Sequence, residues 1–156
     1  MKVLINDSVS VEFPDEYAIL SKEELKRLYL DDNPDRWAIR NEDDHVTIAI
    51  FYHRFNALLG AFAGNKEICQ ANEKKLAKGL KDHDYVFKGF FEKMICEHQA
   101  YGFDYEYQVN SISQIAKTIV MKHGNICYTL YYYVRPGYEE KGQKVFEDFL
   151  NSVSFN

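Results

Sequence analysis

The sequence predicts an α+β fold in which a single antiparallel β-sheet is sandwiched by helices in α/β/α layers. Residues 115–134 are rich in β-forming residues and are interrupted by Gly124-Asn125, a pair typical of a two-residue hairpin turn because glycine adopts positive φ without strain. Both faces of this hairpin are apolar, which is typical of strands covered on each side. Residues 138–151 carry an apolar stripe that indicates a helix packed on a sheet.

The turn also predicts the register of this hairpin. With Gly124-Asn125 as the turn, Met121 faces Tyr128, Ile119 faces Leu130 and Lys117 faces Tyr132, and opposed residues share a face. One face then carries Ile115, Ile119, Met121, Ile126, Tyr128, Leu130, Tyr132 and Val134; the other carries Ala116, Thr118, Val120, Cys127, Thr129, Tyr131 and Tyr133. We therefore expect the hairpin to be central in the sheet.

The N-terminal segment predicts another hairpin followed by a short helix. Residues 2–5 and 8–13 form two strands, the second with alternating apolar and polar residues. Ser21 begins a helix over residues 22–30, because Ser followed by Glu24 three positions later forms a capping box.

The next segment predicts a second hairpin and a longer helix. Two strands over residues 36–40 and 45–54 flank a polar turn. Residues 56–64 fit neither pattern clearly. From there we expect a helix over residues 66–80, with Asn65 as its N-terminal cap.

Two more strands precede the central hairpin. The first covers residues 85–97 and is expected to bulge at Gly89. The second, residues 101–109, alternates regularly: Tyr101, Phe103, Tyr105, Tyr107 and Val109 share one side. The predicted order is ββ-α-ββ-α-ββββ-α, in one domain spanning residues 1–156. Short turns between successive strands make the sheet mainly antiparallel.

Composition excludes several classes of protein. A chain of 156 residues is long enough to bury a core without disulfide or metal crosslinks. A net charge of −5 argues against nucleic-acid or acidic-membrane binding, which needs a basic face. Three cysteines lie far apart with no CxxC, which indicates reduced thiols in the cytoplasm. No stretch of 18 apolar residues predicts a membrane span, and no apolar region at the start predicts a signal peptide.

Several segments resemble the Mog1/PsbP-like family. They are Phe13-Pro14-Asp15-Glu16-Tyr17, the helix begun by Ser21, the long helix before Tyr85, the strand through Gly102-Phe103-Asp104-Tyr105, and the ending from Val145 to Phe155. The resemblance implies an antiparallel sheet between helices. It also implies binding, because the family includes a Ran GTPase-binding protein, an extrinsic photosystem II subunit, bacterial lipoproteins and chaperones for secretion effectors.

Catalytic and metal-binding patterns are weak. The calcium-like series that starts at Asp31 has Arg36 where the sharp turn requires glycine. The glycine-rich residues 60–66 are one residue short of a phosphate-binding loop, and no G-x-S-x-G elbow is present. We therefore predict no metal and no cofactor.

The tyrosines provide the best functional signal. The chain has 12 Tyr and 11 Phe. The tyrosines carry more hydroxyls than a dry core readily satisfies. Core packing explains many of these rings, but some hydroxyls are expected to reach solvent, a pocket or a partner. The candidate binding residues are Tyr101, Tyr105, Tyr107, Tyr131 and Tyr133. The prediction is a non-enzymatic adaptor or chaperone-like protein that binds a protein partner through an aromatic face or edge of the sheet.

Two alternatives remain at this point. The first is a small-ligand-binding or hydrolytic enzyme with a site between sheet and helix around Cys127, His123 or His45. It requires two titratable groups within about 3 Å of each other in a pocket. The second is a homodimer formed through residues 101–109 or the last hairpin.

Overall fold

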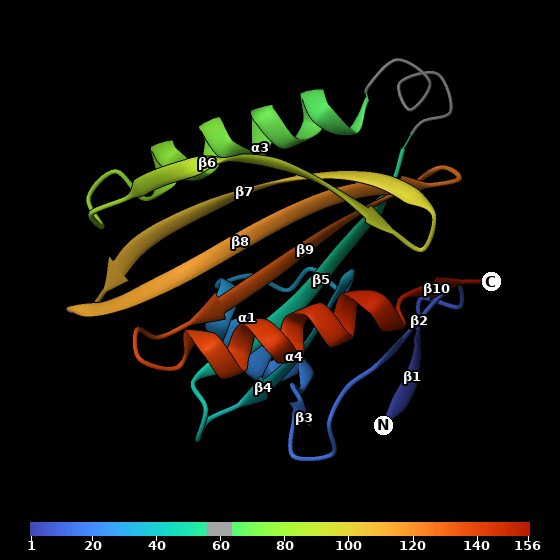
Figure 1. The fold of residues 1–156 in the computed structure, drawn as a ribbon, viewed down its shortest axis with the longest axis horizontal. Helices are drawn as coiled ribbons and strands as arrows, with labels where there is room; N and C mark the ends of the chain where they lie inside the picture. Colours follow the sequence, from blue (N-terminus) through green and yellow to red (C-terminus); the bar gives the residue numbers. More distant parts are fainter. Residues whose placement is uncertain (56–63) are drawn as a thin grey trace.

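A strongly twisted, seven-stranded antiparallel sheet passes through the middle of the molecule in the computed structural model, which describes residues 1–55 and 64–156 (Figure 1). Its strands, in spatial order, are β3 (Ala18–Ile19), β4 (Arg36–Asn41), β5 (Val46–Arg54), β9 (Ile126–Val134), β8 (Ile112–His123), β7 (His98–Val109) and β6 (Val86–Ile95). The helices are α1 (Lys22–Tyr29), α3 (Asn65–Gly79) and α4 (Glu139–Ser152). The predicted α+β class is confirmed. Most of the ambiguous segment 56–64 lies outside the described residues.

The first hairpin corrects the expectation of a single sheet. Strands β1 (Lys2–Ile5) and β2 (Val9–Glu12) form a separate three-stranded sheet with β10 (Ser154–Phe155), a two-residue strand that follows α4. Ser10 pairs with Ser154 and Val9 with Phe155, so the last strand lies beside the second one (Figure 1). The residues after α4 thus occupy the edge of β2 that β1 leaves free.

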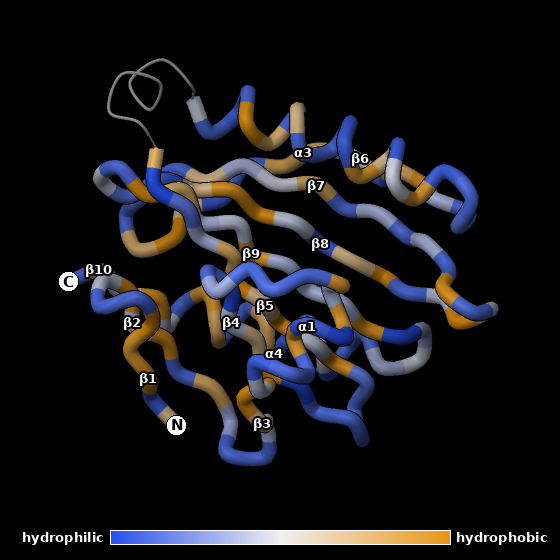
Figure 2. Tube along the Cα trace, turned by 180° about the vertical axis from the view of Figure 1, so that it is seen from behind, coloured by the Kyte–Doolittle hydropathy of each residue, from blue (hydrophilic) through white to orange (hydrophobic). Residues whose placement is uncertain are grey.

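The central hairpin has the predicted register. Met121 pairs with Tyr128, Ile119 with Leu130 and Lys117 with Tyr132. Leu130 and Tyr132 belong to the core that also contains Phe146 from α4, whose ring stacks on Tyr132 at a centroid distance of 4.7 Å. The opposite face packs against α3, an amphipathic helix in which hydrophobic and hydrophilic positions alternate (Figure 2). The hairpin is therefore covered on both sides, by α4 on one and by α3 with α1 on the other.

The helix ends show one correct and one wrong prediction. The Ser21 hydroxyl accepts a hydrogen bond from the Glu24 amide at 3.1 Å, and the Glu24 carboxylate accepts one from the Ser21 amide, which completes the predicted capping box. Asn65 is not a cap: Gly64 holds that position, and Asn65 is the first residue of α3. Its side-chain amide donates to the carbonyl of Gln99 at 2.8 Å, which fastens the start of α3 to β7 instead.

The strand pairing excludes edge-to-edge dimers through the strands first considered. Strand β7 is paired on both sides, as are β8 and β9, so none can accept a partner's strand. Strand β6 forms one outer edge of this sheet, and it has a bulge between Phe87 and Gly89 as the sequence predicts. Its exposed or partly exposed Lys88 and Lys93 and its bulge are features that discourage edge pairing.

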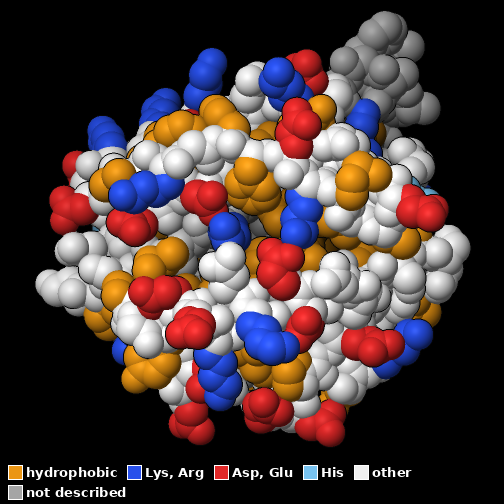
Figure 3. All heavy atoms as spheres, in the orientation of Figure 1, with side chains coloured by type: hydrophobic (Ala, Val, Ile, Leu, Met, Phe, Trp, Pro, Cys, Tyr) orange, Lys and Arg blue, Asp and Glu red, His pale blue; other side chains and the backbone are white. Residues whose placement is uncertain are grey.

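The surface over α4 carries both acidic and basic side chains. On the face drawn in Figure 3, acidic and basic side chains are interspersed. Lys141 pairs with Asp44 at 3.0 Å, Lys144 with Asp148 at 3.2 Å and Lys93 with Glu147 at 2.7 Å. Cys69, Cys96 and Cys127 are all free thiols. Among the described residues, no helix has both the length and the apolar composition that crossing a bilayer requires.

Candidate binding groove

The face of the sheet toward α1 and α3 has rows of side chains that run across the strands. One row, followed through the strand pairs, consists of Arg40, Thr47, Tyr133, Ala116 and Tyr105. The next row consists of Ala38, Ala49, Tyr131, Thr118 and Phe103. In both rows, small alanine and threonine side chains thus lie beside aromatic rings. This pattern leaves space above the sheet between the rings.

Two helices border this space. Helix α1 packs over β4 through Leu25 and Tyr29, and α3 packs over β7 and β8 through Ile68, Leu76 and Leu80. A groove of about 810 Å³ lies between them. It is lined by Leu28, Tyr29, Arg40, Asn41, Glu42, His45, Val46, Thr47, Leu76, Leu80, Tyr105, Tyr107, Val109, Gln114, Tyr133 and Arg135. A second pocket of about 320 Å³ continues along α3, shares Leu76 and Leu80 with the groove, and includes Tyr131.

Four of the five predicted tyrosines form a continuous aromatic series here. Tyr105 stacks on Tyr107 at a centroid distance of 5.9 Å, and Tyr107 meets Tyr133 edge to face at 6.3 Å. Tyr131 and Tyr133 stand two residues apart on β9 with nearly parallel rings, 6.1 Å between centroids. Each ring is held in place by its neighbours, so the surface they present is rigid.

The hydroxyls of these tyrosines differ in what they contact. Tyr105 is 1% exposed, and its hydroxyl lies 3.1 Å from that of Thr118, so it belongs to the floor. Tyr107, Tyr131 and Tyr133 are partly exposed, and none of their hydroxyls makes a well-formed hydrogen bond to a described residue. The buried Tyr29 hydroxyl interacts with that of Tyr133 but is likewise without a well-formed hydrogen bond among the described residues. The groove therefore offers the hydroxyls of Tyr107 and Tyr131 to a ligand.

Burial keeps these tyrosines neutral. It raises the pKa of Tyr107 to about 12 and that of Tyr131 to about 12, and it raises the pKa of Tyr133 still further. The hydroxyls consequently act as hydrogen-bond donors and acceptors near neutral pH, and tyrosinate chemistry is not accessible to them.

Arginines at the groove were not anticipated from the sequence. Arg40 and Arg135 line it and are both partly buried. Arg36, four residues before Arg40 on the same face, places its guanidinium 4.4 Å from the centre of the Phe51 ring and pairs with Asp31. Alternation along residues 36–40 puts Arg36 and Arg40 on one face, but only the order of β4, β5 and β9 brings that face to Tyr133.

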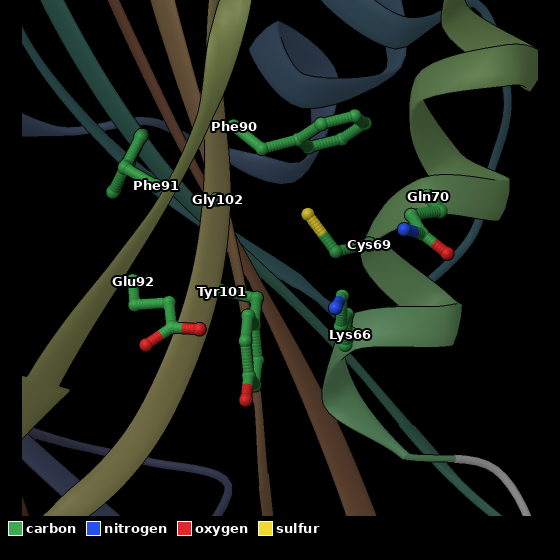
Figure 4. A pocket seen from close by; sticks show the side chains of 8 residues that line it. All are labelled: Lys66, Cys69, Gln70, Phe90, Phe91, Glu92, Tyr101 and Gly102. Atoms are coloured by element: carbon green, nitrogen blue, oxygen red, sulfur yellow. The ribbon is translucent and has the colours of Figure 1, made fainter.

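Tyr101 lies apart from the other four. It lines a cleft of about 180 Å³ beyond the other side of α3, with Phe90, Cys69 and Lys66 among its neighbours (Figure 4). Figure 4 shows Cys69 pointing from α3 toward the strands that carry Phe90 and Tyr101. Burial raises the pKa of the Cys69 thiol to about 11, so this thiol stays protonated near neutral pH.

The residues proposed for an enzyme are not brought together. Cys127 is fully buried, and burial raises its pKa to about 11. His123 lies on the opposite face of the hairpin, where its ring stacks on Phe155 at 4.2 Å and its Nδ1 is 3.0 Å from Nε2 of His98. His45 does line the groove, in the turn between β4 and β5, where it packs against Tyr138. Neither histidine can serve as a base for Cys127 in this arrangement.

The histidine pair makes stability depend on pH. Burial, with a contribution from His98, lowers the pKa of His123. The unfolded chain therefore binds a proton at this site more tightly than the folded protein does. We expect the free energy of unfolding to fall as pH decreases below about 6.5, the unperturbed histidine pKa. Urea titrations at pH 7.5 and 5.5 test this, and the His123→Gln variant should show a smaller difference between the two; an equal difference would contradict it.

Comparison with known proteins identifies the fold. No model of a protein family matches the sequence, and no curated protein matches it either. Cyanobacterial PsbP from Synechocystis sp. PCC 6803 superposes with a TM-score of 0.74 at 8% identity, over 100% of this chain and 92% of that one. The Ran-binding protein Mog1p of Saccharomyces cerevisiae gives 0.60 at 8% identity, over 99% and 94%. A Bacteroides thetaiotaomicron VPI-5482 protein gives 0.62 at 14% identity, over 98% of this chain but 47% of that one. The chain has a Mog1/PsbP-like fold.

Proposed function

We propose that this protein is a non-enzymatic protein-binding domain that holds an extended segment of a partner in the groove between α1 and α3. The observation that carries the proposal is the series Tyr107, Tyr133 and Tyr131, stacked and partly exposed, with hydroxyls that lack well-formed hydrogen bonds to the described residues. Tyrosine gives a binding surface large contact area and a polar group at little entropic cost, because it has few rotatable bonds.

The dimensions of the groove support a peptide ligand. Together with the pocket beside Tyr131, it extends along α3 and accommodates several side chains in succession. Its lining combines apolar side chains such as Leu76 and Leu80 with tyrosines and other polar groups, so it can hold both the side chains and the backbone of a peptide. The Ran-binding protein Mog1p shows that a protein of this fold can bind a protein partner. An adaptor or chaperone-like role in the cytoplasm agrees with three free thiols.

Selection from a displayed library of random linear peptides tests this function. Peptides enriched on the purified protein are expected to lose about tenfold or more in affinity for the Tyr107→Ala variant, since truncating an aromatic anchor in a binding site removes at least about 1.4 kcal/mol. Tyr101→Ala is the matched control: it removes a partly exposed tyrosine from the same strand but outside the groove.

Affinities are measured by fluorescence anisotropy, and circular dichroism establishes that each variant is folded. If no enriched peptide distinguishes Tyr107→Ala from the unmodified protein, or if Tyr101→Ala weakens binding as much, the groove is not the binding site.

A further inference from the structure

We infer that the partner segment carries an oxyanion, either the carboxylate of an acidic residue or a phosphoryl group, which Arg40 and Arg135 bind at one end of the groove. This inference rests on the proposed function, because it assigns the chemistry of a ligand that occupies the same groove. It is carried by the position of the two arginines and by their lack of partners.

Both arginines lie next to the tyrosine series. Arg40 is opposite Thr47, which is in turn opposite Tyr133, so Arg40 and Tyr133 belong to one row on the same face of the sheet. Arg135 follows Tyr133 by two positions, which in an extended chain places the two residues about 7 Å apart on one face. Both side chains line the groove.

Neither guanidinium has a partner within the described part of the chain. No ion pair or hydrogen bond joins the Arg40 or Arg135 side chain to another described residue, although both residues are partly buried. Arg36 nearby, by contrast, is paired with Asp31. A partly buried charge without a partner is unfavourable, and an anionic ligand would remove that penalty.

The acidic side chains around this end do not neutralise the arginines. Asp44 is engaged by Lys141 at 3.0 Å and by the Asn41 side chain, also at 3.0 Å. Glu42 is the single acidic residue that lines the groove among the described residues, and it is exposed and unpaired with either arginine. Two arginines and one glutamate thus line the groove, in a protein whose net charge is −5.

The geometry also predicts the spacing within the ligand. A large apolar or aromatic side chain seated on Tyr107 and Tyr133 would lie about 7 Å from a group held by Arg135. Two residues of an extended peptide span the same distance, so we expect the anchor and the acidic residue to be two positions apart. Guanidinium groups bind carboxylates and phosphates through paired, parallel hydrogen bonds.

The test uses the enriched peptides from the displayed library, resynthesised in three forms: with the acidic residue as selected, with that residue changed to its amide, and with phosphoserine in its place. Arg40→Gln and Arg135→Gln are each expected to weaken the acidic peptide about tenfold, the cost of losing one charge-assisted pair. Arg54→Gln is the control, because it removes one exposed arginine at the far end of β5, outside the groove. Raising the salt concentration should weaken binding to the unmodified protein more than binding to the double arginine variant.

The outcomes separate the two proposals. Loss of affinity in both arginine variants and in the amide peptide supports the inference, and the phosphoserine form shows which oxyanion is preferred. Peptides that need Tyr107 but carry no acidic residue, or that bind the arginine variants as well as the unmodified protein, overturn this inference and leave the proposed function standing. Failure to enrich any Tyr107-dependent peptide overturns both.

Discussion

Replacing Phe146 by alanine is expected to lower the free energy of unfolding by about 3–5 kcal/mol, the range for deleting a buried phenylalanine ring. Phe146 is fully buried on the inner side of α4, and its ring stacks on Tyr132 in the centre of the sheet with an interplanar angle of 13°. Removing the ring takes away its transfer free energy and leaves a cavity. Paired strands on both sides of β9 cannot close that cavity easily.

Urea unfolding followed by the fluorescence of Trp37 provides the measurement. Trp37 is the single tryptophan of the sequence, and it stacks on Phe149 from the same helix at 6.2 Å. Lys144→Ala is the control on α4, since Lys144 is exposed and forms only a surface ion pair with Asp148; we expect it to change stability by less than about 0.5 kcal/mol. A loss below about 1 kcal/mol for Phe146→Ala would show that α4 does not anchor this core.

A second large effect is expected at Gly102, where alanine should destabilise the protein by about 1–3 kcal/mol through overpacking. A β-carbon at this position would lie 2.5 Å from Cζ of Phe91 and 2.6 Å from the carbonyl oxygen of Thr118. The carbonyl belongs to the backbone of β8, which is fixed by its pairing with β7 and β9, so it cannot move away. The Phe91 ring alone could move.

Gly79→Ala is the matched control for this substitution. Gly79 is the last residue of α3, and no heavy atom lies within 4 Å of the β-carbon that alanine would add. Helical glycine to alanine should be neutral or stabilising by up to about 1 kcal/mol. Combining Gly102→Ala with Phe91→Ala should cost less than the sum of the two single changes, because the first clash is then absent. Equal melting temperatures for Gly102→Ala and Gly79→Ala would contradict the close approach.

Sequence reasoning succeeded where local chemistry determines the outcome. The turn at Gly124-Asn125 set the pairing of Met121 with Tyr128, and the pattern of Ser21 and Glu24 set the start of α1. It failed where a distant contact decided. Asn65 has a side chain suited to capping, but it is the first residue of α3 rather than its cap, and its amide donates to the carbonyl of Gln99 on a distant strand. The two-residue strand β10 has no sequence pattern of its own and exists only because β2 offers it an edge.

The candidate groove, too, was predictable from the sequence where local pattern decides and not where distant strands meet. Alternation placed Tyr105 with Tyr107 on one side of β7 and Tyr131 with Tyr133 on one face of β9, and the structure brings these two pairs together. Tyr101 shares their strand face but is separated from them by α3. Arg40 could not be joined to them from the sequence, because its place beside Tyr133 depends on β5 lying between β4 and β9. Lateral strand order is a property of the whole sheet.

The small sheet of β1, β2 and β10 has a consequence for synthesis on the ribosome. Phe155 pairs with Val9, and the amide of Asn156 donates to the carbonyl of Ser8 at 2.9 Å. A nascent chain therefore cannot finish this sheet until residues 154–156 have left the exit tunnel, whatever the central strands have already formed. Val9 and Val11 are buried in the finished protein. Until the sheet is complete they lack contacts that bury them, and we expect a holdase chaperone to bind there.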